Sequence, residues 1–289
     1  MEDKALVTGY MRQKKTRSCE DTFGNLLLWA RFYDAGIAEV EGMLVVAMQK
    51  GQLSFHYPYG RGDVKKCIEA LMAYAEEQGQ EFCLHSVVPE DFEELERLFP
   101  GQFAIEYDRD VADYVYESEK LCSLSGKKYH GKKNHINKFK RLYPDWEYVT
   151  MTEENAEEAF QLLLRWRELN GCNEDAEKNA EGCVAANYLR LFKELDVCGG
   201  MLRIDGQTAA FTVGEAVCDD TMVVHIEKAL TQFEGAYTMI NQQFVEHECG
   251  QYTYVNREED TGDEGLRKAK LSYRPVFMVE KGMVKRKKA

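Results

Sequence analysis

The sequence predicts an α/β protein with two consecutive domains, each built on a mixed sheet. Its 289 residues exceed the roughly 100 to 200 residues of an ordinary domain. With 44% hydrophobic residues, the chain can bury two separate cores. One order of strands and helices also occurs in both halves of the chain. We therefore expect a first domain at residues 1–118 and a second at 119–289, which begins with a basic helical connector at 119–143.

The first half contains the first copy of this order. Gly42 separates two apolar runs and predicts a turn between two strands. Asp63 is the expected cap of a helix that Gly79 ends, and Pro89 begins a second helix. The strands predicted in this half span residues 37–41, 43–49, 52–57, 81–88 and 103–107.

The second half repeats the order after an additional strand and two helices. The dipeptide Asp205-Gly206 lies between two apolar runs and is a strong hairpin signal. Gly235 begins the next helix and Gly250 ends it. The strands predicted in this half span residues 146–150, 200–204, 208–215, 221–227, 251–256 and 276–279. The predicted helices cover 153–170, 184–195, 235–250 and 263–272.

Net charge and motif content argue against several classes of function. Asp and Glu number 50 against 37 Lys and Arg, so the net charge is −13, which argues against a DNA-coating role. No apolar run approaches the roughly 20 residues of a membrane helix. The first residues lack a secretory pattern, so we expect a cytoplasmic protein. The nine cysteines include no C-x-x-C pair, which predicts free thiols and no metal site.

The order of the elements resembles the GNAT acyltransferase fold, which would occur here twice. Three segments extend the resemblance to individual residues. They are Arg109-Asp110-x-x-Asp113-Tyr114-Val115-Tyr116, the stretch at 132–139 and the stretch at 256–270. In these segments the chain resembles the phosphatidylglycerol lysyltransferase C-terminal family, and the resemblance covers almost the whole chain.

The resemblance implies tandem GNAT-like domains and a likeness to the Fem-type peptidyltransferases. It also implies transfer of an aminoacyl group from charged tRNA to a lipid headgroup. The characterised lysyltransferases attach this domain to a membrane-embedded domain, whereas we expect no membrane part in this sequence.

The central strand of the second copy carries candidates for acid–base chemistry. Period-two alternation places His225 and Glu227 on one face and Lys228 on the other. A buried carboxylate and imidazole are costly unless they are paired or functional. GNAT enzymes often have a general base on this strand, so the resemblance makes Glu227, with His225 beside it, the candidate general base. The alternative is a structural ion pair of Glu227 with Lys228 or Arg257. The resemblance makes Tyr273 a candidate general acid, with core packing as its alternative.

Two charged segments contain the candidate substrate-binding residues. One follows the strand at 251–256, where loops line the cleft of an α/β sheet. Arginine there can hold a phosphate or carboxylate through two parallel hydrogen bonds. The other ends the first copy and is expected to line a groove between the domains, or alternatively to form a salt-bridge set there. The candidates are Arg109, Asp110, Asp113, Tyr116, Lys228, Asn256, Arg257, Glu258, Asp260, Arg267 and Lys270.

One loop bears on the acyl donor. In GNAT enzymes a Gln/Arg-x-x-Gly-x-Gly/Ala loop holds the coenzyme A pyrophosphate at a helix N-terminus. Glu234 and Tyr237 depart from what such a site needs, so an ordinary strand-to-helix turn is the alternative. The residues that match the pattern, and so are candidate cofactor-binding residues, are Gln232, Gly235 and Ala236.

The connector contains the densest positive charge in the chain, with aromatic residues between the cations. In an acidic protein such a cluster is a candidate surface for tRNA or an anionic headgroup, and a solvated helix face is the alternative. The cations are Lys127, Lys128, Lys132, Lys133, Lys138, Lys140 and Arg141.

Together these features predict a transferase. It would pass an aminoacyl group from charged tRNA to an amine or hydroxyl acceptor bound between the domains, without a covalent enzyme intermediate. One alternative is an acyl-CoA-dependent N-acetyltransferase with acetyl-CoA as donor. The other is an inactive module that binds tRNA or a small ligand. We expect no DNA partner.

Overall fold

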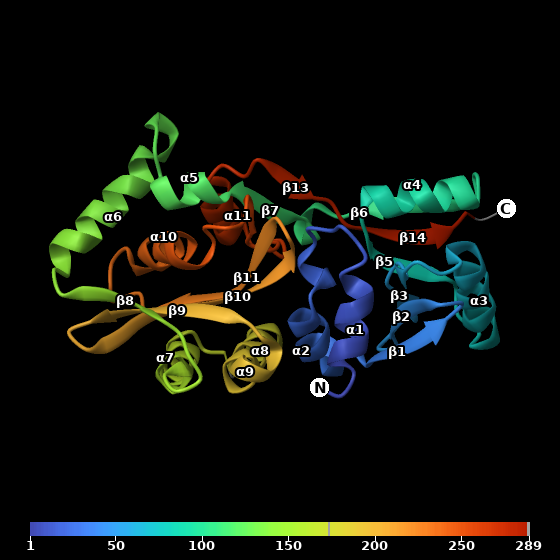
Figure 1. Ribbon diagram of the computed structural model, residues 1–289, viewed down its shortest axis with the longest axis horizontal. Coiled ribbons are helices and arrows are strands. Elements are labelled where there is room, and N and C mark those ends of the chain that lie inside the picture. Colours follow the sequence, from blue (N-terminus) through green and yellow to red (C-terminus); the bar gives the residue numbers. More distant parts are fainter. Residues whose placement is uncertain (173, 288–289) are drawn as a thin grey trace. The chain divides into compact units, whose positions relative to one another are not determined.

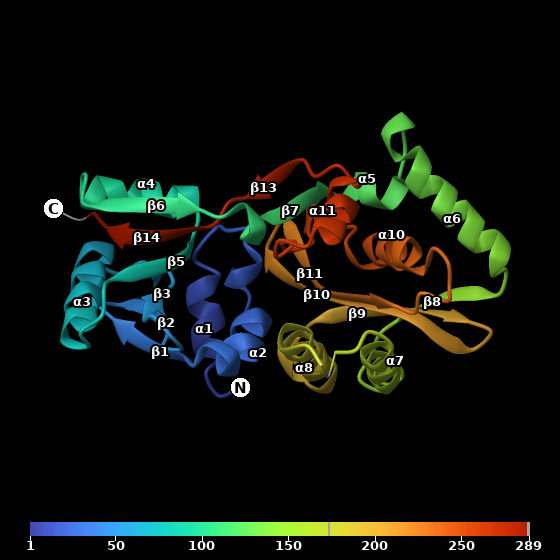
Figure 2. The same cartoon turned by 180° about the vertical axis from the view of Figure 1, so that it is seen from behind.

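The computed structural model describes residues 1–172 and 174–287. The chain divides into two compact units. Unit 1 consists of Met1–Asp113, Glu259–Glu264 and the chain from Met278 onward, and unit 2 consists of Tyr114–Glu258 and Gly265–Phe277. Figures 1 and 2 show the elements of both units from opposite sides.

Unit 1 is built on a mixed sheet with the strand order β1-β2-β3-β5-β14-β6, and β4 pairs with β2. Its strands are β1 (Ala35–Val40), β2 (Met43–Met48), β3 (Ser54–Phe55), β4 (Tyr59–Gly60), β5 (Cys83–Val87), β6 (Phe103–Tyr107) and β14 (Gly282–Arg286). Its helices are α1 (Lys4–Met11), α2 (Phe23–Tyr33), α3 (Val64–Glu77) and α4 (Pro89–Leu98), with 3-10 turns η1 (Cys19–Asp21) and η2 (Arg109–Val111). One apolar core joins this sheet to α3 and α4, and its fully buried members include Ile68, Leu84 and Leu95.

Local sequence signals explain the first elements of this unit. Glu41 and Gly42 both have positive φ, 52° and 74°, which is the backbone of a tight hairpin turn between β1 and β2. The Asp63 carboxylate accepts a hydrogen bond from the Lys66 N–H at 3.0 Å and so caps α3. Pro89 occupies the first turn of α4, where its missing N–H costs nothing. These three predictions are confirmed.

Two strands belong to sheets that the order of the repeat does not predict. β14 pairs antiparallel with β5 and β6, so it lies in the sheet of unit 1, whereas the sequence placed the chain beyond residue 118 in the second domain. β7 (Asp113–Glu117) follows the first copy but pairs with β12 in the sheet of unit 2. Strand partners are chosen by hydrogen bonds between distant segments, which the order of elements does not encode.

Unit 2 is built on a second mixed sheet, with the order β13-β7-β12-β11-β10-β9-β8. Its remaining strands are β8 (Trp146–Thr150), β9 (Cys198–Ile204), β10 (Gln207–Cys218), β11 (Thr221–Ala229), β12 (Tyr254–Asn256) and β13 (Phe277–Val279). Its helices are α5 (Ser118–Ser123), α6 (His130–Leu142), α7 (Ala156–Leu169), α8 (Ala176–Arg190), α9 (Phe192–Leu195), α10 (Ala236–Glu248) and α11 (Glu264–Leu271), with the 3-10 turn η3 (Lys127–Tyr129). In both views α10 lies on one face of this sheet, and α7 and α8 lie on the other.

The strands β11 and β12 begin as a parallel pair and then separate. The pairing covers three positions and ends with Val223 opposite Asn256. β11 continues to Ala229 and pairs there with its other neighbour, β10. The predicted hairpin at Asp205-Gly206 joins β9 to β10. Side chains that follow Val223 and Asn256 therefore lie where β11 and β12 separate.

A β-bulge at His225 changes the facing of side chains on β11. Ile226 is opposite Val213 and Val224 is opposite Gly214, so His225 is the additional residue. The bulge brings the strands close at Gly214, where a Cβ would lie 2.7 Å from the Val223 carbonyl oxygen. The prediction that His225 and Glu227 share a face is therefore wrong, because simple alternation does not allow for an additional residue.

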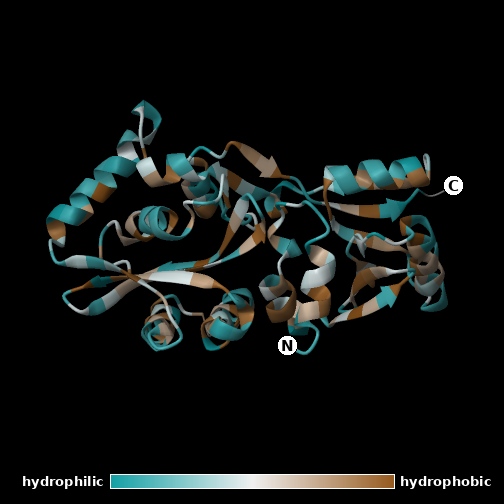
Figure 3. Ribbon diagram, viewed as in Figure 1, coloured by the Kyte–Doolittle hydropathy of each residue, from teal (hydrophilic) through white to brown (hydrophobic). Residues whose placement is uncertain are grey.

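Hydropathy is distributed as expected for a folded α/β chain. Figure 3 shows α6 mainly in hydrophilic colours, and its buried side chains are Ile136 and Phe139. Among the described helices, none has both the length and the apolar composition to cross a membrane. The predicted fold class, α/β with a mixed sheet in each of two units, is confirmed.

Candidate functional site

The main cluster of charged side chains in unit 2 lies where β11 and β12 separate. Arg257 directly follows β12, and its Nη2 donates a hydrogen bond to Glu227 Oε1 on β11 at 2.9 Å. The second carboxylate oxygen of Glu227 accepts a hydrogen bond from Asn241 Nδ2 on α10 at 3.0 Å. The two side chains of the ion pair are only 13% and 12% exposed. The ion pair of Glu227 and Arg257, left open by the sequence, is present.

Arg257 has a donor to spare. Its Nη1 is buried and has no hydrogen-bond partner within the described part of the chain. Burial opposes the charge of this guanidinium, but Glu227 outweighs burial and raises the pKa of Arg257. Because a buried cationic donor without a partner is costly, Nη1 is a candidate donor to an oxygen atom of a ligand.

Aromatic rings surround the guanidinium. Its central carbon lies 4.8 Å from the centroid of the Tyr273 ring and 5.9 Å from that of Tyr116. Burial raises the pKa of Tyr273, and Arg257 partly counteracts this. Tyr273 is 5% exposed, so its hydroxyl stays protonated in a protected position. It is thus close enough to Arg257 for the two residues to belong to one site.

Lys132 of α6 joins the same cluster. Its Nζ lies 3.9 Å from the centroid of the Tyr273 ring. Burial and then the charge of Arg257 lower the pKa of Lys132 to about 8. The sequence predicts Lys132 to be part of a nucleic-acid surface, because nothing in the connector distinguishes it from its neighbours. The cations that remain exposed are Lys127, Lys128, Lys133, Lys138, Lys140 and Arg141.

Three predicted substrate-binding residues fix the backbone around Arg257. Lys270 Nζ donates to the Arg257 carbonyl oxygen at 2.7 Å, and the Tyr116 hydroxyl donates to the Lys270 carbonyl oxygen at 2.9 Å. Asn256 Oδ1 accepts from the Glu258 N–H at 2.7 Å and shapes the turn after β12. These contacts position Arg257. Another predicted residue, Arg267, lies half-buried on α11.

A second charged cluster occupies the opposite face of the sheet. His225 Nδ1 lies 2.7 Å from Glu258 Oε1, and its Nε2 lies 3.5 Å from Glu215 Oε2. The ring stacks on Tyr188 of α8. Burial opposes the charge, but hydrogen bonds with Glu215 and Glu258 outweigh it and raise the pKa of His225 to about 9. His225 is therefore an imidazolium at neutral pH and cannot serve there as a base.

Lys228 points to the same face as His225. It forms an ion pair with Glu181 of α8, and its Nζ lies 4.1 Å from the centroid of the Trp166 ring. Lys228 therefore pairs with Glu181, and Glu227 pairs with Arg257. Of the two partners that the sequence left open for Glu227, the structure thus contains the second.

The loop that matches the coenzyme A pattern packs against α6. The Glu234 N–H donates to the Tyr143 hydroxyl at 3.1 Å, and the Glu234 carboxylate pairs with Lys138 at 2.5 Å. A Cβ on Gly235 would lie 3.3 Å from the His135 carbonyl oxygen. The residues predicted to bind a cofactor in this loop are Gln232, Gly235 and Ala236.

The other predicted substrate-binding residues lie in unit 1. Arg109 Nη1 and Asp260 Oδ2 are 3.4 Å apart, and the Asp110 carbonyl oxygen accepts from the Thr261 N–H. Asp113 pairs with Lys281 at 2.8 Å, and both side chains are fully buried. These groups form ion pairs and turns within one unit, whereas the alternative for this segment was a salt-bridge set between the domains.

The Asp113 cluster contains three atoms suited to a metal ion, from Cys19, Asp113 and Glu259. The Lys281 ammonium already lies among them, 2.8 Å from Asp113, 3.5 Å from Cys19 Sγ and 3.6 Å from Glu259. These charges raise the pKa of Lys281 well above its ordinary value despite burial. A side-chain ammonium therefore already occupies the position among these atoms.

Comparison with known proteins bears on this geometry. The family model described as phosphatidylglycerol lysyltransferase, C-terminal, matches residues 11–285. A conserved protein of unknown function from Bacteroides thetaiotaomicron VPI-5482 is 38% identical. Its crystal structure aligns with a TM-score of 0.94 over 99% of this chain and 97% of that one.

More distant relatives share the fold or part of the sequence. The structure of L-PGS from Bacillus licheniformis is 16% identical and aligns with a TM-score of 0.66 over 99% of this chain and 92% of that one. An uncharacterized protein of Mycoplasmoides gallisepticum is 23% identical over 181 residues, 60% of this chain. The match spans 56% of that curated relative. The chain thus shares the fold of the L-PGS structure, and a mixed sheet is present in each of its two units, as predicted.

Proposed function

The chain belongs to the phosphatidylglycerol lysyltransferase C-terminal family, and from this premise we propose that it is an aminoacyltransferase with charged tRNA as its donor. The acceptor in this proposal is an amine or a hydroxyl group. The observation that supports the proposal most is the buried Arg257 Nη1, which lacks a partner among the described residues beside the anchored carboxylate of Glu227. Such a pair offers one group for a proton and one for a developing negative charge.

In the proposed reaction, the acceptor attacks the ester carbonyl carbon of the donor. Glu227 takes the proton of the acceptor, since a carboxylate has lone pairs left after its bonds to Arg257 and Asn241. Arg257 Nη1 donates a hydrogen bond to the oxyanion. When the bond to the tRNA ribose breaks, the leaving oxygen takes a proton from Tyr273. Water then returns the proton from Glu227 to Tyr273.

Two observations favour charged tRNA over acetyl-CoA as the donor. The Glu234 N–H, in the loop where GNAT enzymes hold pyrophosphate, already donates to Tyr143, and α6 lies against Gly235. The same helix region carries exposed cations such as Lys133 and Arg141, which suit tRNA phosphates. The rival N-acetyltransferase would need α6 to leave this loop.

A binding experiment separates the two donors. A pool of charged tRNA and acetyl-CoA are each titrated into the purified protein across a salt series. We expect tRNA binding that weakens with salt, and Lys133→Gln with Arg141→Gln should reduce the slope of log K against log salt by roughly 1.5. Lys50→Gln with Arg61→Gln removes two exposed cations of unit 1 and serves as the matched control.

The outcomes are distinct. An unchanged slope in the control, together with the reduced slope in the α6 variant, supports the aminoacyl donor. Micromolar binding of acetyl-CoA without any binding of tRNA would replace the proposal with the N-acetyltransferase. Binding of tRNA without transfer to any acceptor would favour the inactive module.

A further inference from the structure

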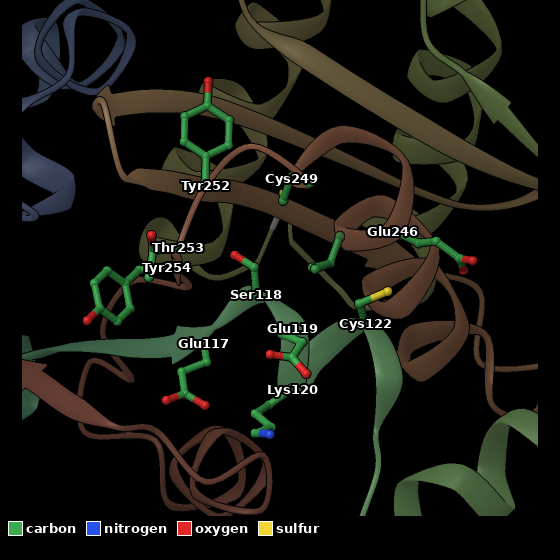
Figure 4. Close-up of a pocket in the computed structure, with 12 residues that line it drawn as sticks. Glu117, Ser118, Glu119, Lys120, Cys122, Glu246, Cys249, Tyr252, Thr253 and Tyr254 are labelled. Carbon is green, nitrogen blue, oxygen red and sulfur yellow. The ribbon is translucent and has the colours of Figure 1, made fainter.

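We propose that a hollow at the C-terminal end of α10 is a binding site for a small organic ammonium ion. Its volume is about 630 Å³, within the roughly 300 to 1,000 Å³ of small-molecule sites. Figure 4 shows side chains from the end of β7, from α5, from the end of α10 and from the segment that leads into β12. The hollow shares no lining residue with the cluster around Glu227 and Arg257.

The charge of the lining selects a cation. The lining contains three carboxylates, those of Glu117, Glu119 and Glu246, and one ammonium group, that of Lys120. The last turn of α10 adds the partial negative charge of a helix C-terminus. Cys122 also lines the hollow, and burial, followed by the charge of the Glu246 carboxylate, raises the pKa of its thiol. The negative charge of the lining is therefore felt by a group inside the hollow. An anionic ligand would be repelled by the same groups.

A buried hydroxyl provides an independent indication of a ligand. Ser118 is 7% exposed, and its Oγ has no hydrogen-bond partner in the described part of the protein. The Ser118 N–H donates to the Thr253 carbonyl oxygen at 3.0 Å, so the backbone at this position is fixed. Figure 4 shows the Ser118 side chain among the other lining residues. Buried hydroxyls are normally hydrogen-bonded, and a ligand in the hollow would satisfy this one.

An ammonium group matches these acceptors. It has three N–H donors and no acceptor, so it can bind the Ser118 oxygen and the carboxylates of Glu117 and Glu119 together. A neutral alcohol of the same length would make weaker hydrogen bonds and would gain nothing from the charge of the lining. The proposal therefore distinguishes ligands by charge at constant size.

Calorimetric titration with 1,4-diaminobutane tests this site, with 1,4-butanediol as the uncharged control. We expect the diamine to bind and the diol to show no binding under the same conditions. Glu119→Gln with Glu246→Gln should weaken diamine binding by about tenfold or more, since the first removes a charge-assisted hydrogen bond and the second removes a negative charge from the lining. Ser118→Ala should weaken it by a smaller factor. Glu106→Gln, an exposed glutamate of β6 in unit 1, should leave it unchanged.

Three results would overturn the proposal. They are no diamine binding at millimolar concentration, equal binding of the diol, and diamine binding that is insensitive to both sets of lining variants. The glutamate substitutions concern partly or fully exposed side chains, so these variants are expected to fold. The titration requires no transferase activity, and its outcome is therefore independent of the proposed function.

Discussion

The two units contain the same parallel strand pair but place different chemistry after it. In unit 1, β3 pairs with β5, and the next residues are His56 and His85, whose ring centroids lie 4.2 Å apart. In unit 2, β11 pairs with β12, and Arg257 follows the last pair and binds Glu227 across the opening.

The difference is one of charge. Burial lowers the pKa of His56 to about 4, and burial and then His56 lower that of His85 well below its ordinary value, so the pair is neutral at pH 7. Arg257 and Glu227 are charged, and Arg257 keeps a spare donor. A parallel pair thus precedes polar side chains in both units, but the chemistry of those side chains decides whether they can stabilise a charged intermediate.

The largest expected effect concerns the buried charges of unit 1, which lie outside its strand pair. Lys281→Met leaves the fully buried Asp113 without its cation. We expect the free energy of unfolding to fall by about 4 kcal/mol, measured by urea unfolding. Adding Asp113→Asn should recover part of the loss, because it removes the unpaired charge. A loss below about 1 kcal/mol would show that unit 1 does not depend on this pair.

The histidines of the two units should respond to pH in opposite directions. The folded pKa of His225 is about 9, above its ordinary 6.5, so its contribution is complete below pH 6.5 and is lost as pH rises through 9. The shift corresponds to about 3 kcal/mol. The folded pKa of His56 is about 4, so its contribution is complete above pH 6.5 and is lost as pH falls through 4.

Unfolding by urea at several pH values measures both changes. His225→Phe should remove the dependence between pH 6.5 and 9.5, and His56→Phe should reduce that between pH 6.5 and 4. If the wild type and His225→Phe lose stability in parallel above pH 6.5, the imidazolium between Glu215 and Glu258 is not formed.

Arg257→Met should have a smaller effect on stability, because the pair is about one-tenth exposed. We expect a loss of about 2 kcal/mol, from leaving Glu227 buried without its cation. Arg203→Met is the matched control in the same unit, since Arg203 pairs with Glu158 at a more exposed position and should cost less than about 1 kcal/mol. Equal losses for the two variants would mean that Glu227 does not need a buried partner.

The smallest effect is expected for His85→Phe. Neither ring nitrogen of His85 has a hydrogen-bond partner among the described residues, so an apolar ring of similar size removes a buried polar cost. We expect stability to stay within about 1 kcal/mol of the wild type, or to rise. A loss above about 2 kcal/mol in the same urea assay would show that His85 has a partner, such as a buried water molecule.

Much of the fold could be predicted because its signals are local. The turn at Gly42, the Asp63 cap and the hairpin at Asp205-Gly206 each depend on residues within one turn of backbone. The sheet positions of β7 and β14 could not be predicted, since they depend on pairing between segments far apart in the chain.

The candidate site could be predicted in part for the same reason. Glu227 and Arg257 stood out as charges beside buried strands. The bulge at His225 moved that side chain to the opposite face, and no spacing rule indicates it. Lys132 and Asn241 reach the site from helices distant in sequence. For Asn241, the available signal was a polar residue at a position where the helix is expected to be buried.

The most direct test of the central claim is single-turnover transfer of a labelled aminoacyl group from charged tRNA to lipid or amine acceptors. The comparison is between Glu227→Gln beside the parallel pair of unit 2 and His85→Phe after the parallel pair of unit 1. We predict that the first lowers the rate by about 10² or more and that the second leaves it unchanged. An unchanged rate for Glu227→Gln, or a loss confined to His85→Phe, would contradict the assignment of the reaction to unit 2.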